Sequence, residues 1–137
     1  MFTTYTGGVM SGYGFIKTLD CTVEEAEVKV TEALKKEGFG ILTRIDMKEK
    51  FKEKLGIDFK KYIILGACNP PLALKSVSAE ENIGLLLPCN VIVYEKEGKA
   101  VVGVIKPSSA MGMIRNDALQ ETAGIVEDKL QRVIEAL

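Results

Sequence analysis

Residues 62–71 read Tyr-Ile-Ile-Leu-Gly-Ala-Cys-Asn-Pro-Pro, an apolar run that ends in a Cys-Asn pair and two prolines. Residues 85–94 read Leu-Leu-Leu-Pro-Cys-Asn-Val-Ile-Val-Tyr and set a second Cys-Asn pair among apolar residues. The first run is apolar at consecutive positions, which indicates a central strand covered at least in part on both faces. We therefore predict two strands whose ends carry Cys68, Asn69, Cys89 and Asn90.

Helix and strand signals alternate on either side of these two runs. Thr22 and Glu25 form a capping box, and Asn69 before Pro70 is a typical helix start. We expect strands at residues 13–19, 39–45, 62–67, 90–95 and 100–105, with a further extended piece near 2–5. We expect helices at residues 22–37, 46–55, 72–79 and 116–137. This order predicts one α+β domain over residues 1–137, a two-layer α/β sandwich with an about five-stranded, mixed or mainly antiparallel sheet and three to four helices.

Charge and composition narrow the range of partners. The 137 residues include 18 basic and 19 acidic side chains, a formal net charge of −1. The protein therefore lacks the net positive charge that would attract nucleic acid or an anionic membrane. The first residues do not resemble a signal peptide, and no apolar run approaches the ~20 residues that span a bilayer. We expect a cytoplasmic protein whose three cysteines are reduced thiols.

The chain contains no histidine. This excludes Ser-His-Asp and Cys-His catalysis and every metal site that needs an imidazole. Two cysteines alone make an incomplete zinc site, so we assign no metal and no cofactor.

Cys68 follows a buried strand and directly precedes a predicted helix start. Unpaired N–H groups and the helix dipole favour an anion there, so Cys68 is a candidate nucleophile, although a free cysteine can equally be a small buried hydrophobe. Cys89 begins a neighbouring strand. The two thiols could therefore meet as a reversible disulfide, as ligands of a soft metal, or as one thiol with a structural partner.

Polar residues near the thiols are candidates for ligand binding. Asn69 and Asn90 each offer an acceptor and two donors that suit a carboxylate or an amide, with helix capping and turn formation as the structural alternatives. Lys106 directly follows the last predicted strand and could pair with an anion, while Met111 and Met113 could line an apolar pocket. The candidate ligand-binding residues are Cys68, Asn69, Cys89, Asn90 and Lys106.

Residues 38–46, 65–71 and 84–94 together resemble the hallmark stretches of the domain of unknown function 302 family, and the resemblance extends over residues 13–137. It implies a compact α/β domain of bacteria and archaea that forms a homodimer. It brings no established reaction and no assigned catalytic residues. Both Cys-Asn pairs match the family pattern, which favours their lying in one cluster.

Three functional hypotheses fit these features. The first is a small-ligand-binding or sensing domain with its pocket at the Cys-Asn strand ends, for a small anionic or polar ligand. The second is a thiol-dependent redox protein or enzyme that uses Cys68 and Cys89. The third is a structural or dimerisation module without a small-molecule site.

Overall fold

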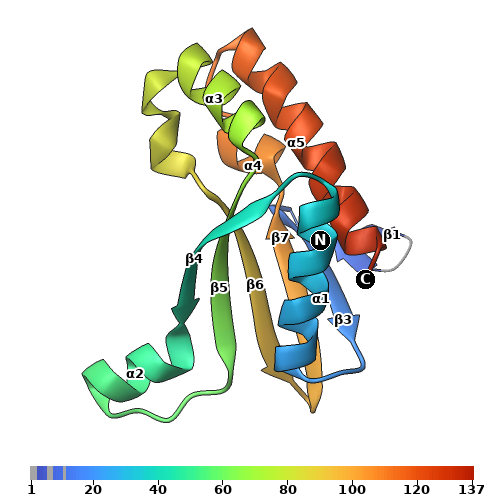
Figure 1. The fold of residues 1–137 in the computed structure, drawn as a ribbon, viewed down its shortest axis with the longest axis vertical. Coiled ribbons are helices and arrows are strands. Elements are labelled where there is room, and N and C mark those ends of the chain that lie inside the picture. Colours follow the sequence, from blue (N-terminus) through green and yellow to red (C-terminus); the bar gives the residue numbers. More distant parts are fainter. Residues whose placement is uncertain (1–2, 6–7, 11) are drawn as a thin grey trace.

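The computed structural model describes residues 3–5, 8–10 and 12–137, which form one antiparallel sheet and its helices (Figure 1). The strands are β1 (Thr3–Tyr5), β2 (Gly8–Met10), β3 (Gly14–Leu19), β4 (Gly40–Asp46), β5 (Tyr62–Cys68), β6 (Cys89–Lys96) and β7 (Lys99–Ile105). The helices are α1 (Val23–Lys36), α2 (Met47–Leu55), α3 (Pro70–Ala79), the 3-10 helix η1 (Glu81–Leu86), α4 (Pro107–Met111) and α5 (Asp117–Glu135).

The strand order is β1-β2-β3-β7-β6-β5-β4, and each neighbouring pair is antiparallel. α1 carries the chain from β3 to the far edge at β4, and β5, β6 and β7 then return strand by strand. The predicted α+β class and the five antiparallel strands are confirmed in β3 to β7. Two three-residue strands, β1 and β2, extend the β3 edge; the extended piece expected near residues 2–5 corresponds to β1, and Phe2 lies outside the described residues.

α1 and α5 cover one face of the sheet and close the main core (Figure 1). Alternate strand residues point to this face because successive side chains of a strand point in opposite directions. They include Phe15 and Leu19, Ile63 and Leu65, Val91 and Val93, and Val102 and Val104, all buried. The helices contribute Val30 and Leu34 of α1 and Leu130 and Ile134 of α5, which are fully buried.

A second, smaller hydrophobic cluster lies beyond the ends of the strands, where α3, η1, α4 and the first turns of α5 gather (Figure 1). It consists of the buried side chains of Ile83, Met111, Leu119 and Ala123. α5 is long enough to belong to both clusters. The short helices η1 and α4 were not predicted from the sequence.

The opposite face of the sheet is partly covered, as the sequence predicted for the central strand. Tyr62 and Ile64 of β5 and Ile92 and Tyr94 of β6 are only half buried. β5 therefore has one fully packed face and one partly covered face, which agrees with the cover on both sides that its continuous apolar run indicated.

α2 forms where its start and stop signals predicted, but its apolar stripe is not part of the core. No residue of α2 is buried, because the helix follows the edge strand β4 and extends away from the sheet (Figure 1). Phe51 instead contacts Phe59 edge to face, with ring centroids 5.1 Å apart.

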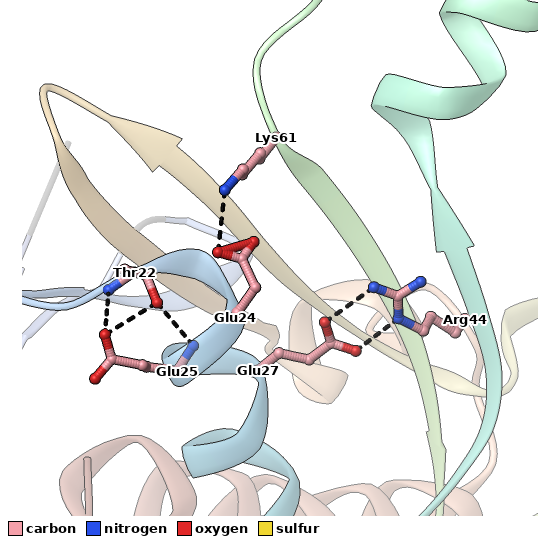
Figure 2. A network of polar contacts seen from close by, with 6 residues as sticks. All are labelled: Thr22, Glu24, Glu25, Glu27, Arg44 and Lys61. Carbon is pink, nitrogen blue, oxygen red and sulfur yellow. Dashed lines mark hydrogen bonds and ion pairs between the residues drawn. The ribbon is translucent and has the colours of Figure 1, made fainter.

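α1 is fixed by its cap and by two ion pairs to the sheet side (Figure 2). The Thr22 hydroxyl accepts from the Glu25 N–H at 3.1 Å, and the Glu25 carboxylate accepts from the Thr22 N–H at 3.3 Å. Arg44 of β4 donates twice to the Glu27 carboxylate, at 2.7 and 3.1 Å, and Lys61 pairs with Glu24 at 3.0 Å. None of the helices in the described residues combines the length and the apolar character needed to span a bilayer.

We expect Thr22→Ala to lower the free energy of unfolding by about 1 kcal/mol, because the N–H of Glu25 loses its cap acceptor. Lys61→Met is the matched control and should cause no measurable change, since the Lys61–Glu24 pair is exposed to solvent. Urea unfolding followed by circular dichroism measures both. A larger loss for Lys61→Met than for Thr22→Ala would contradict this assignment.

Candidate functional site

The end of β5 and the start of β6 form the floor of a pocket of about 280 Å³. Ala67, Cys68 and Asn69 line it from the β5 side, and Pro88 and Cys89 line it from the β6 side. α3 and α5 form the facing wall through Leu72, Ala73 and Ser76 and through Ala123 and Val126. The two Cys-Asn segments thus meet at one pocket, to which they contribute both thiols and one of the two amides.

Strand pairing brings the two cysteines together. Ala67 pairs with Cys89 across the β5–β6 ladder, and Cys68 is the next residue of β5. Cys68 is half buried, whereas Cys89 is only 8% exposed. Burial, with a smaller contribution from nearby Cys68, raises the pKa of the Cys89 thiol from its ordinary value of 9.0 to about 11. Cys89 is therefore a neutral thiol at physiological pH.

The Asn69 side chain links the start of α3 to the end of α1 through two hydrogen bonds. Its side-chain oxygen accepts from the Leu72 N–H at 3.4 Å, and its amide nitrogen donates to the Glu37 carbonyl at 3.2 Å. The helix-cap prediction is confirmed. Gly38 makes room for this amide, because a Cβ at Gly38 would meet the Asn69 nitrogen at 2.9 Å in a backbone that already has a φ of +87°.

The remaining predicted ligand residues lie elsewhere. Asn90 is exposed and pairs with Gly66, one position after the Cys89–Ala67 pair, so it belongs to the opposite face of the sheet. There it lines a separate hollow of about 250 Å³ together with Tyr13 and Tyr62. Lys106 is half buried before α4 and does not line the pocket.

Several lining residues were not predicted from the sequence. Leu42 is one of them: the β4–β5 register shifts between Ile41 and Thr43, and this bulge leaves Leu42 unpaired at the pocket with 65% of its surface exposed. Phe39 and Leu87 also line it. Met111 lines the pocket as the sequence suggested, whereas Met113 is 86% exposed and does not.

Helical spacing in α3 was the one sequence signal that could have identified some of these lining residues. Leu72, Ala73 and Ser76 recur at the spacing that places residues on one helix face, and all three line the pocket. Ser76 is buried, and its hydroxyl donates to the Leu72 carbonyl at 2.9 Å within the helix. Its polar group is therefore satisfied without a ligand.

Within the part of the chain that the structure describes, the residues that line the pocket include no charged side chain, and the sequence contains no histidine. Among the described residues, no three or more His, Cys, Asp or Glu side chains gather in a metal-binding group. Among the described lining residues there is therefore no carboxylate or imidazole to act as a general base and no complete set of hard ligands for a cation, and the potential nucleophiles are the thiols of Cys68 and Cys89 and the Ser76 hydroxyl.

The fold and the site define a class: a two-layer α+β protein whose antiparallel sheet ends in an apolar pocket with two thiols. The sequence profile described as "Domain of unknown function DUF302" matches residues 15–137, and the chain belongs to this family. The crystal structure of the uncharacterized conserved protein DUF302 from Bacillus stearothermophilus is similar, with 31% identity and a TM-score of 0.85. That match covers 92% of this chain and 98% of the other. No curated protein matches the chain.

The raised pKa of Cys89 predicts a loss of stability at high pH. The folded protein binds the thiol proton more tightly than the unfolded chain does. The resulting contribution of Cys89 to the free energy of unfolding is therefore complete below about pH 9 and is lost as the pH rises to about 11. Two units correspond to roughly 2–3 kcal/mol. Denaturant unfolding between about pH 8 and 11 should show this extra loss in the wild type and not in Cys89→Ala. Parallel pH profiles of the two proteins would refute the assignment.

Proposed function

We propose that the protein is a small-ligand-binding or sensing domain and that its ligand occupies the pocket between the β5 and β6 ends and α3. The observation that carries the proposal is the concave pocket of about 280 Å³ at the two Cys-Asn segments, with Cys68, Asn69 and Cys89 in its lining. This volume is near the lower end of the range for small-molecule sites, roughly 300–1,000 Å³.

The walls of this pocket are held in place by the fold. Cys89 and Ala67 belong to paired strands, and the Asn69 bonds to Leu72 and to the Glu37 carbonyl fix the start of α3 against the end of α1. A pocket with fixed walls binds a ligand at a lower entropic cost than one that must order on binding. The geometry therefore favours binding over a purely structural role for the Cys-Asn segments.

The thiol-redox alternative has less support. A resolving thiol must become a thiolate to attack, and burial holds the pKa of Cys89 at about 11. No side chain of the lining can accept its proton, since the lining contains no charged residue.

We also propose that the protein is located in the cytoplasm. Cys21, Cys68 and Cys89 are free thiols, which is typical of that reducing compartment.

Native mass spectrometry of freshly purified protein tests the binding proposal. We expect a non-covalent adduct on the wild type and about tenfold weaker retention by Ala73→Leu, since a leucine at Ala73 takes up space in the pocket. Ala79→Leu in the same helix does not alter the lining and should retain the adduct. A wild-type protein without any adduct, or equal retention by Ala73→Leu, would count against the pocket as the site.

We also propose that a second copy of the chain covers the half-exposed face of the sheet. Ile16, Ile64 and Ile92 form an aliphatic surface there, and beside them the Tyr62 and Tyr94 rings stack with centroids 5.3 Å apart. Apolar side chains with aromatic neighbours are typical of the centre of protein interfaces. Lys60 lies over the Tyr94 ring at 4.7 Å and supplies a charged rim.

Sedimentation velocity over a range of concentrations tests the homodimer. Ile92→Lys should weaken the dimer more than about tenfold, because it places a charge in the apolar centre of this face. Leu85→Lys is the control: Leu85 is 88% exposed on η1, away from the sheet face, and the change should leave the dimer intact. A monomeric wild type, or dimers that withstand Ile92→Lys while the fold is retained by circular dichroism, would refute the interface.

A further inference from the structure

We propose that the ligand of the pocket is an uncharged, mainly apolar molecule, about the size of a two-ring aromatic compound or a short alkyl chain. The inference rests on the proposed ligand-binding function and names the chemistry of its ligand. It departs from the anionic or polar ligand that the sequence favoured.

The polar groups of the lining already have partners within the protein. Asn69 caps α3 and bonds to the Glu37 carbonyl, and the Ser76 hydroxyl donates to the Leu72 carbonyl. The buried Cys89 thiol is a weak donor, and the other lining side chains apart from Cys68 are apolar. A ligand in this pocket therefore meets few free polar groups.

A charged ligand would have no counter-ion. Lys106 was the cation expected near the site, but it does not line the pocket, and no other charged side chain does. A carboxylate or phosphate that enters such a lining loses its water without gaining a pair, which costs far more than it costs an uncharged molecule. The same reason disfavours a cationic ligand.

The pocket separates the two hydrophobic clusters of the molecule. Phe39, Leu72 and Val126 of its lining belong to the main core, whereas Met111 and Ala123 belong to the smaller cluster. Protein interiors are otherwise close-packed with few large voids. An apolar ligand would fill this gap and join the two clusters into one continuous core.

Small side chains keep the space open. Ala67, Ala73 and Ala123 line the pocket from β5, α3 and α5, and each leaves room that a larger apolar side chain would occupy. The resulting volume of about 280 Å³ is roughly twice the ~150 Å³ apolar cavity that accommodates benzene. This comparison sets the size of the ligand.

Naphthalene and 2-naphthoate provide a matched pair of probes that differ in charge. Each is titrated into the ¹⁵N-labelled full-length chain, freed of any co-purified adduct by unfolding and refolding, and binding is followed by two-dimensional NMR. We expect naphthalene to bind at least about tenfold more tightly than 2-naphthoate and to shift the signals of residues 67–69, 73 and 89. Ala73→Leu should weaken naphthalene binding about tenfold, and Ala79→Leu should leave it unchanged.

Ser76→Ala provides a second readout. If the ligand is apolar, this variant binds naphthalene as tightly as the wild type, as Ser78→Ala on the exposed side of α3 should. Preference for 2-naphthoate, or a polar adduct whose retention depends on the Ser76 hydroxyl, would overturn the apolar inference and leave the binding function intact. If neither probe binds and purified protein carries no adduct, both proposals fail.

Discussion

The register of β5 against β6 is the constraint on which the site depends. Ala67 lies opposite Cys89, so Cys89 points to the face that α1 and α5 cover, and Asn90 points to the other face. A slip of one residue would exchange these two side chains, because the side-chain period of a strand is two. The buried Val91, Val93, Ile63 and Leu65 prevent the slip, since it would move the whole apolar row out of the core.

The pairing of β5 with β6 also places the start of α3 beside the pocket. β5 ends at Cys68, and the next residue, Asn69, caps α3, so the helix that lines the pocket starts directly after the strand that lines it. Asn69 also reaches back to the Glu37 carbonyl at the end of α1, close to Gly38. The amide thus couples the packed layer of helices to the pocket. This structural task accounts for the Cys-Asn-Pro-Pro sequence without a catalytic role for Asn69.

The elements that local sequence determines were predictable. The capping box at Thr22, the Asn69-Pro70 start and the Asn116 cap each specify a helix through bonds within a few residues, and all three helices form there. The strands expected at residues 13–19, 90–95 and 100–105 likewise form, as β3, β6 and β7. Prediction was weaker where distant segments decide the outcome: the apolar stripe of α2 lies outside the core, with Phe51 against Phe59, and Asn90 and Lys106 do not line the pocket.

The sequence by itself determined an α+β protein with a mixed or mainly antiparallel sheet, without imidazole chemistry and with two Cys-Asn segments at strand ends. Only the tertiary structure decided that Cys68, Asn69 and Cys89 share a pocket while Asn90 and Lys106 do not line it. It also decided that the lining is uncharged, because this depends on residues such as Leu42, Met111 and Ala123 that are far apart in the chain. Capping hydrogen bonds and apolar periodicity depend on residues that are close in the sequence, whereas the chemistry of a pocket depends on which distant residues packing brings together.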